Sequence, residues 1–433
     1  MAEMDREVVV VGGGLGGLAA ATYLARAGRS VTLFEKARAL GGRAATHVED
    51  GFHFNLGPHA LYRDGEGMKV LRELNVTFAG GIPAVAGSYA VDGGRKHTLP
   101  GGFVSLLTTS LFGLGGKLET ARLLGTVQKI DARAIQDASV REWLDRHIRN
   151  AAVRRLVQAL FRVATYANAP EQQSAGAALE QLQMALGANV LYLHRGWQTL
   201  VAGLRSAAEA AGVTIVNGTR VVTVDHDRTV RGVHLADGTT RTAAAVVIAA
   251  TPSDVAALLP TCDAARRWTD DLIPVRAACL DIALSHLPQP HARFALGLDQ
   301  PLYLSVHSAV ANLAPKSNAT ICVAKYLAPG ASDPKADERE LDQLLDLAQP
   351  GWRGVLVHRR FLPAMMVTGA LVTATMGGTA GRPGPMVPGV EGVYVVGDWV
   401  GRCGQLADAT LASAKRAAEL ITASASARVP AAA

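Results

Sequence analysis

A run of four valines that leads into a cluster of glycines, VVVVGGGLGG at residues 8–17, constrains the fold of this chain more than any other feature. Consecutive β-branched residues predict a strand that is buried on both faces, as in a parallel sheet. A helix is predicted to follow from Leu15 to Ala27, and Gly28 marks its end. The chain therefore begins with a buried strand, a glycine turn and a helix.

The glycines of this turn follow the pattern G-x-G-x-x-G at Gly12, Gly14 and Gly17. In such a turn the first glycine permits the tight bend, the second lets the backbone approach a pyrophosphate, and the third lets the helix pack against the strand. The unpaired N–H groups of the helix N-terminus then point at the phosphates. The pattern predicts a Rossmann-like dinucleotide site. The alternative is a glycine-rich turn that packs only on itself.

A second strand is predicted at Ser30–Glu35, and it ends in an acid. Glu35 lies eighteen residues after Gly17, close to the spacing at which a carboxylate accepts ribose hydroxyls. Gly41-Gly42-Arg43 follows as a second flexible turn, in which an arginine can donate to a diphosphate. NAD and FAD both fit the first turn, and this second turn favours FAD.

The stretch from Glu35 to Arg43, E-x-x-x-x-x-G-G-R, resembles the flavin amine oxidase superfamily, which includes phytoene desaturases and protoporphyrinogen oxidases. The resemblance implies FAD as the cofactor. It extends to Phe52–Tyr62, where Gly57-Pro58-His59 is similar to the phytoene desaturase version of the family's third flavin segment. Val221 or Val222 is expected to bracket the adenine.

The C-terminal stretch Gly392–Ile421 is predicted to form a strand, a loop and a helix. Asp398 ends the strand, where a carboxylate can hold a ribityl hydroxyl. The helix begins near Leu406–Asp408, and its N–H groups can stabilise negative charge on a reduced flavin. The predicted cofactor-binding residues are thus Gly12, Gly14, Leu15, Gly17, Glu35, Lys36, Gly42, Arg43, Gly57, Pro58, His59, Val222, Gly397, Asp398, Leu406 and Ala407.

The predicted fold class is α/β, with a discontinuous Rossmann-like FAD-binding domain and an α+β substrate domain. Residues 1–75, 190–262 and 385–421 are assigned to the first, and residues 76–189 and 263–384 to the second. Residues 422–433 are small and are expected to form a disordered tail. The glycine-rich stretch at 373–384 has no predicted strand before it and no helix after it, so a second site for NADPH is not expected.

His59 and Lys325 are the candidate catalytic residues. An imidazole near the flavin can move a proton or orient substrate, although His59 can equally be a packing residue. Some amine oxidases of the family place a lysine beside flavin N5, whereas a lysine at a strand end usually reaches solvent. A covalent flavin bond to Cys403 is not expected, because the surrounding residues do not match the family's motif. Arg195, Trp197, Tyr303 and His307 are further pocket candidates.

The resemblance implies an enzyme, an FAD-dependent oxidoreductase that dehydrogenates a hydrophobic small molecule by hydride transfer to flavin. The bond oxidised is C–C or C–N, and oxygen or a quinone accepts the electrons. Three alternatives are an amine oxidase proper, a flavin-dependent isomerase or reductase, and a non-catalytic FAD-binding partner. The aromatic content of 5% counts against the paired aromatic cage of the amine-oxidising members.

Composition excludes other classes. The net charge of +6 has no dense basic run, so nucleic-acid binding is not expected. The four cysteines form no C-x-x-C pair, and no metal site is expected. The polar N-terminus and the short apolar runs predict a cytoplasmic protein without an integral membrane segment. The apolar, charge-free stretch at 101–116 is predicted to be a buried helix; a substrate entry or a peripheral membrane contact is the alternative. A homodimer is left open.

Overall fold

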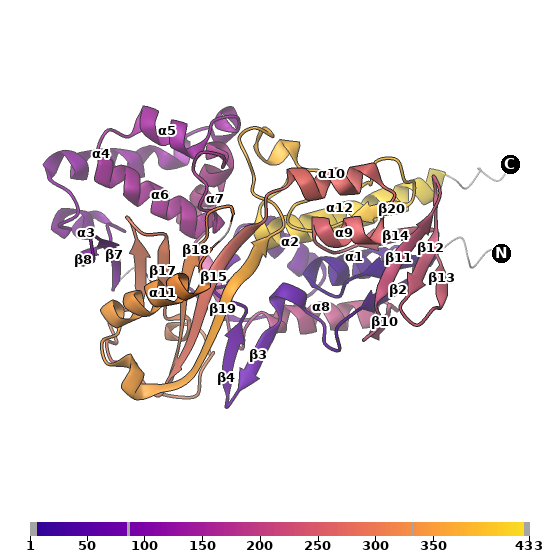
Figure 1. The fold of residues 1–433 in the computed structure, drawn as a ribbon, viewed down its shortest axis with the longest axis horizontal. Coiled ribbons are helices and arrows are strands. Elements are labelled where there is room, and N and C mark those ends of the chain that lie inside the picture. Colours follow the sequence, from indigo (N-terminus) through magenta and orange to yellow (C-terminus); the bar gives the residue numbers. More distant parts are fainter. Residues whose placement is uncertain (1–6, 85–86, 331, 428–433) are drawn as a thin grey trace.

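The computed structural model describes residues 7–84, 87–330 and 332–427. Two large sheets organise these residues, one of five strands and one of seven. Figure 1 shows the five-stranded sheet on the right, near both termini, and the seven-stranded sheet on the left below a group of helices. The functional cavity described below is lined by residues of both halves.

The five-stranded sheet is parallel, in the order β10-β2-β1-β14-β20. Its strands come from three distant stretches of the chain, as a discontinuous Rossmann-like domain requires. The predicted α/β fold class is therefore confirmed, whereas the exact domain boundaries stay a prediction. The strands are β1 (Glu7–Val11), β2 (Ser30–Glu35), β10 (Thr214–Asn217), β14 (Ala245–Ile248) and β20 (Val393–Val395).

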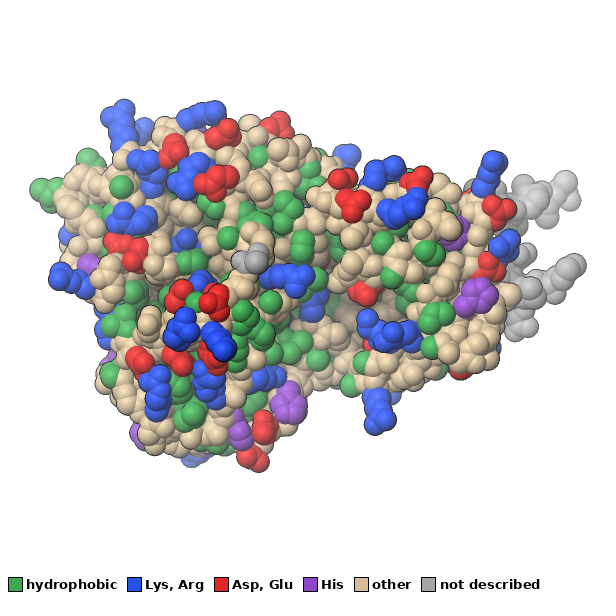
Figure 2. Space-filling view, viewed as in Figure 1, with side chains coloured by type: hydrophobic (Ala, Val, Ile, Leu, Met, Phe, Trp, Pro, Cys, Tyr) green, Lys and Arg blue, Asp and Glu red, His purple; other side chains and the backbone are tan. Residues whose placement is uncertain are grey.

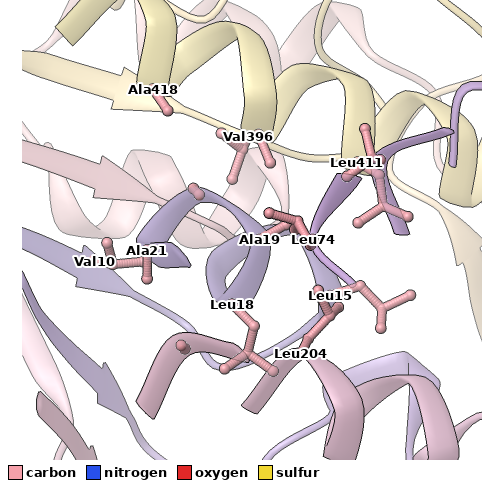
Figure 3. Close-up of a cluster of buried hydrophobic side chains, with 14 of the residues drawn as sticks. Val10, Leu15, Leu18, Ala19, Ala21, Leu74, Leu204, Val396, Leu411 and Ala418 are labelled. Carbon is pink, nitrogen blue, oxygen red and sulfur yellow. The ribbon is translucent and has the colours of Figure 1, made fainter. Parts of the chain in front are cut away.

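The valines of β1 are buried on both faces of this sheet, as their sequence predicts. Val8 and Val10 belong to the core that contains the helix α1 (Leu15–Arg26), and Val9 belongs to the core on the opposite face. Figure 3 shows Leu18, Ala19 and Ala21 of α1 packed among residues of neighbouring elements. Small alanines let α1 approach α8 (Gln198–Ala210) and α12 (Leu406–Ala427) closely.

The opposite face of the sheet is covered by a meander and two helices. The meander joins three antiparallel strands. These elements are β11 (Val221–His226), β12 (Val230–Leu235), β13 (Thr240–Thr242), α9 (Pro252–Leu258) and α10 (Asp263–Asp271).

The seven-stranded sheet is mixed, in the order β19-β15-β18-β17-β16-β7-β8. All neighbouring pairs are antiparallel except β16 with β7. The helix α11 (Pro334–Ala348) packs against one face. The strands are β7 (Ser88–Asp92), β8 (Arg95–Thr98), β15 (Val275–Leu284), β16 (Phe294–Gly297), β17 (Leu302–Ser305), β18 (Ala319–Tyr326) and β19 (Leu356–Thr368).

A group of five helices follows β8. Ser139 caps one of them: its Oγ accepts from the backbone N–H of Glu142 at 3.1 Å, and the Glu142 carboxylate accepts from the backbone N–H of Ser139 at 3.0 Å. The two bonds together form a capping box. The helices are α3 (Phe103–Thr108), α4 (Leu114–Thr126), α5 (Val140–His147), α6 (Ala151–Thr165) and α7 (Ala175–Ala188).

Short elements join the two halves. The strands β3 (Thr46–Glu49) and β4 (Phe52–Asn55) form a hairpin, and β9 (Val190–Leu193) pairs with both β5 (Leu61–Tyr62) and β6 (Gly80–Gly81). The helix α2 (Glu66–Glu73) packs against α12. The glycine-rich stretch at 373–384 holds only a short 3-10 turn, Gly378–Gly381.

Two expectations are wrong. The helix α12 continues to Ala427, so residues 422–427 are helical and not part of a disordered tail; alanines favour the helix, and the Thr422 hydroxyl donates to the Ala418 carbonyl. Residues 428–433 lie outside the described part. The stretch at 101–116 is not a buried helix, because Phe103 and Leu114 are 77% and 88% exposed and only a few residues such as Leu106 face the core.

Within residues 7–84, 87–330 and 332–427, no helix combines the length and the apolarity that are needed to cross a bilayer.

The glycine turn generates a stability prediction. A Cβ at Gly17 would lie 1.9 Å from the Gly12 carbonyl oxygen, which is backbone and cannot move away without shifting β1. Gly17→Ala is therefore expected to lower the free energy of unfolding by about 1–3 kcal/mol or more. Gly115→Ala is the matched control, since a Cβ there meets nothing within 4 Å on α4. Urea denaturation measures both variants, and equal stabilities would contradict the close packing of α1.

Candidate active site and cofactor cleft

A cavity of about 720 Å³ opens at the carboxyl ends of β1 and β2. This is the edge at which open parallel sheets bind ligands. Its walls include the glycine turn, the end of β2, residues 41–44 and 56–62, the start of β11, part of β19 and the start of α12. Fifteen of the sixteen predicted cofactor-binding residues line it: Gly12, Gly14, Leu15, Gly17, Glu35, Lys36, Gly42, Arg43, Pro58, His59, Val222, Gly397, Asp398, Leu406 and Ala407.

Gly57, the sixteenth residue, lies just behind the cavity wall. It has a φ of +73°, and a Cβ there would lie 2.8 Å from the Cys279 Sγ atom. Only glycine meets both conditions without strain. Gly57 thus permits the turn that places Pro58 and His59 in the wall.

The glycine turn presents bare backbone to the cavity. Gly12 has a φ of +105°, and a Cβ there would lie 2.6 Å from the Ala249 carbonyl oxygen. At Gly14, the N-cap of α1, a Cβ would meet no atom closer than 3.7 Å, and no side chain caps the helix. The free N–H groups of α1 therefore remain available to an anionic ligand.

Glu35 is held rigidly beside this turn. It is 8% exposed, its Oε2 accepts from the Gly13 N–H at 2.7 Å, and its Oε1 accepts from the Ala37 N–H at 2.8 Å. A carboxylate has about four acceptor positions, so two remain for ribose hydroxyls. At the more exposed rim, Lys36 Nζ lies 3.6 Å from the Asp254 carboxylate.

Arg43 and Asp398 form an ion pair across the cavity wall, 2.5 Å from nitrogen to oxygen. Arg43 also donates to the Val367 carbonyl of β19, and the second Asp398 oxygen accepts from the Gly369 N–H at 2.8 Å. Behind the pair, Arg382 donates to the backbone carbonyl of Asp398, and burial lowers the Arg382 pKa to about 10. Both predicted charges thus face the cavity from fixed positions.

His59 bridges two backbone segments of the wall. Its Nδ1 lies 3.1 Å from the Gly57 carbonyl oxygen, and its Nε2 lies 3.1 Å from the Arg43 carbonyl oxygen. Its ring packs edge-on against Trp197, with centroids 4.9 Å apart. Burial is the largest effect on the imidazole and lowers its pKa below 6.5. His59 is therefore neutral at neutral pH.

Asp408, in the first turn of α12, lines the cavity although it is missing from the predicted set. It is 2% exposed; its Oδ1 accepts from the Gly67 N–H at 2.8 Å, and its Oδ2 has no hydrogen-bond partner among the described residues. Burial raises the Asp408 pKa to about 7. The sequence signal that could have identified Asp408 is an acid in the first turn of the last helix.

The part of the cavity wall around Pro58 is apolar and aromatic; we call it the apolar end. Tyr166 donates its hydroxyl to the Pro58 carbonyl at 3.2 Å, and Met365 of β19 lies beside Gly57. Leu56 and Trp197 complete it. Trp197 was a pocket candidate from the sequence. Tyr166 and Met365 were missed, because nothing in their local sequence indicates which residues they face.

Lys325 is a wrong prediction. Its Nζ lies 2.9 Å from an Asp337 oxygen and 2.8 Å from a Glu340 oxygen, both on α11. Among the described residues that line the cavity, Lys325 is not found. The two carboxylates of α11 hold the lysine on the helix-covered side of the sheet, as a structural ion pair.

Tyr303, His307 and Arg195 are likewise absent from the described lining of the cavity. Tyr303 and His307 belong to a buried polar cluster, in which the Tyr303 hydroxyl lies 3.2 Å from His307 Nε2 and Tyr192 stacks on the imidazole. Burial lowers the His307 pKa to about 3. Arg195 lies in the turn after β9, with a φ of +60°. Cys403 is an exposed free thiol in the loop before α12.

These features fit FAD. Bare glycine backbone and an uncapped helix N-terminus suit a diphosphate, and the fixed Glu35 carboxylate suits a ribose.

Comparison with known proteins identifies the family. The model described as "Flavin containing amine oxidoreductase" matches residues 15–279. The chain belongs to this family. It is therefore an FAD-dependent oxidoreductase of the flavin-containing amine oxidoreductase family, and the predicted family, enzyme class and cofactor are confirmed.

Similar proteins point in the same direction. A carotenoid 3,4-desaturase of Haloarcula japonica is 60% identical over 52 residues, which are 12% of this chain and 10% of that protein. A 4,4'-diaponeurosporene oxygenase of Staphylococcus aureus is 47% identical over 58 residues, 13% of this chain and 12% of that protein. The matches thus span about a tenth of these relatives. An oxidoreductase from Methanosarcina mazei shares the fold, with a TM-score of 0.77 at 18% identity, over 95% of this chain and 100% of that one.

The position of Glu35 generates a binding prediction. The substitution Glu35→Ala leaves two backbone N–H groups without their acceptor. It also removes the two acceptor positions that remain for ribose hydroxyls. Charge-assisted hydrogen bonds contribute about 1.5–3 kcal/mol each, so FAD affinity is expected to fall ten- to a hundredfold. Titration of the apoprotein with FAD measures the change. The exposed Glu49→Ala is the control and should leave affinity unchanged; a Glu35 variant that binds as tightly would place Glu35 away from the ribose.

Proposed function

We propose that this enzyme dehydrogenates a hydrophobic small molecule at a C–C bond, with hydride transfer to FAD. The observation that supports this most is the composition of the apolar end: Leu56, Pro58, Tyr166, Trp197 and Met365. None of these five side chains carries a carboxylate that could pair with a substrate ammonium group. Apolar walls of this kind recognise hydrocarbon by the area they remove from water.

The location of Lys325 also favours C–C over C–N oxidation. The amine-oxidising hypothesis depends on a lysine near the reacting centre, and both ion pairs of Lys325 are to α11. The Haloarcula japonica relative is by name a desaturase of a carotenoid. We therefore propose a long apolar isoprenoid as the substrate class, and oxygen or a quinone as the electron acceptor.

The chain's own residues bind, orient and exclude water. FAD, when bound, supplies the hydride acceptor. The turn at Gly12–Gly17 and the N-terminus of α1 hold the diphosphate, and Glu35 holds the ribose. The apolar end keeps water from the reacting carbons and aligns them. Because the neutral His59 imidazole lies between two backbone carbonyls and can donate its one N–H to either of them, we propose that His59 is a positioning residue that packs between the segments of Arg43 and Gly57.

Anaerobic substrate screening tests the proposed reaction. The FAD-loaded protein is mixed with carotenoid hydrocarbons in detergent micelles, with primary amines and with NADPH, and the visible flavin band is followed. The hydrocarbons should bleach it. Bleaching by amines would show an amine oxidase, and fast bleaching by NADPH would show a reductase. A flavin that none of a broad set of apolar substrates reduces would contradict the proposal and favour a non-catalytic FAD-binding role.

The role of His59 generates a prediction on pH. Because burial lowers its pKa, the imidazole is neutral above pH 6.5, and the rate of flavin reduction should show no inflection from this group at or above that value. His59→Ala should slow reduction about ten- to a hundredfold through lost positioning. His59→Gln, which can still donate to one carbonyl, should recover part of the rate. An inflection above pH 6.5 that His59→Gln removes would instead show proton transfer by the imidazole.

A further inference from the structure

The helices α3 and α4 present a group of large apolar side chains to solvent. We call this group the α3–α4 surface. Figure 2 shows hydrophobic side chains protruding at its left edge, where α4 lies in Figure 1. The exposed fractions range from 54% to 88%, although burial is usual for such residues. The surface consists of Phe103, Val104, Leu107, Leu114 and Leu118.

This surface is held in place by the underlying core. Leu106 and Phe112 are buried in the helical core beneath it, and Lys117 Nζ donates to the Leu107 carbonyl, which ties α4 to α3. On α4 the exposed apolar residues Leu114 and Leu118 are one turn apart, whereas Gly116 and Thr120 face inward. The exposed leucines are therefore an outer face and not a misplaced part of the core.

Basic residues accompany these apolar side chains in sequence. Between residues 95 and 129 the chain carries five lysines and arginines and a single acid, Glu119. The Glu119 carboxylate is engaged: it accepts from the backbone N–H groups of Arg149 at 2.7 Å and Asn150 at 2.9 Å. The segment that carries the α3–α4 surface is thus cationic. Its basic residues are Arg95, Lys96, Lys117, Arg122 and Lys129.

An apolar depression adjoins this region on α4. It lies between α4, α6 and α7 and is lined by apolar residues alone, and two of them, Leu124 and Leu186, are exposed. Apolar side chains of α4 therefore reach solvent near its start, at Leu114 and Leu118, and near its end, at Leu124. A surface of this extent on one lobe is a feature of interaction sites.

We propose that the α3–α4 surface inserts into the interface of an anionic lipid bilayer and holds the protein at the membrane as a peripheral protein. Apolar side chains beside lysines and arginines are the combination that binds acidic headgroups and the outer part of the acyl region. A second copy of the chain is the weaker occupant, because self-association through this face brings two cationic segments together. The proposal goes beyond the dehydrogenase function and is independent of the substrate.

Vesicle binding tests this proposal with the full FAD-loaded chain. The protein is sedimented with vesicles of phosphatidylcholine alone and of phosphatidylcholine mixed with phosphatidylglycerol. Stronger binding to the anionic vesicles, weakened by salt, is expected. The double variant Leu114→Ser/Leu118→Ser should bind at least tenfold more weakly, since each leucine removed from the bilayer costs about a factor of ten. Arg122→Gln/Lys129→Gln should lose most of the preference for anionic lipid.

A matched control separates the surface from exposed apolar residues in general. Val48 and Met386 are 54% and 59% exposed and lie outside the α3–α4 surface, so Val48→Ser/Met386→Ser should bind vesicles like the unaltered protein. Retained FAD verifies that each variant folds. Absence of vesicle binding by the unaltered protein overturns the proposal. Equal binding by Leu114→Ser/Leu118→Ser and by Val48→Ser/Met386→Ser overturns it as well. A dimer in sedimentation velocity that Leu114→Ser/Leu118→Ser dissociates, without vesicle binding, would assign the surface to a second copy.

Discussion

The Arg43 guanidinium and the Asp398 carboxylate, 355 residues apart in the chain, meet at 2.5 Å in the wall of the cofactor cavity. Arg43 follows the second strand of the parallel sheet, and Asp398 follows the last one. Through Val367 and Gly369, the same pair holds the end of β19 from the other sheet. The Asp398 side chain is only 3% exposed, so removing Arg43 would leave a buried carboxylate without its cationic partner. The cavity exists where it does because these three segments are held together.

Around this pair the cavity wall has two chemically different parts, one polar and one apolar. The glycine turn, the α1 N-terminus and Glu35 offer hydrogen-bonding groups whose positions are set by backbone geometry. The apolar end offers surface area and aromatic edges, with Tyr166 anchored to the Pro58 carbonyl. A rigid polar part suited to the cofactor lies beside an apolar part that we propose for the substrate, as flavin chemistry requires, because the cofactor is reused while substrates enter and leave.

The proposed membrane contact agrees with this division. A substrate of long hydrocarbon character resides in lipid, so an enzyme that acts on it gains from contact with the bilayer surface. The exposed leucines of α3 and α4 offer such a contact in a chain whose described helices are not suited to crossing a membrane. The two proposals rest on separate residues, and each can fail without the other.

The sequence predicted the location of the cofactor residues better than that of the catalytic residue Lys325. The predicted cofactor residues of the turn and of the strand ends do line the cavity, because their neighbours in sequence fix their geometry, and their contact with FAD stays a prediction. Lys325 was assigned through the chemistry of relatives, and its actual environment depends on Asp337 and Glu340 of α11. The stretch at 101–116 was expected to be buried because it is apolar, yet burial depends on whether another element covers it.

The sequence by itself determined the Rossmann-like sheet, the glycine turn and the acid that follows β2. These features are local: Gly17 is required by its contact with Gly12 in the same turn, and the valine run fits only a doubly covered strand. Only the tertiary structure decided which residues form the apolar end, where His59 and Asp408 find their partners, and which leucines remain in solvent. Tyr166, Met365 and Asp408 come from the C-terminal end of α6, from β19 and from α12. Strand or helix periodicity indicates a buried face without saying what lies opposite it.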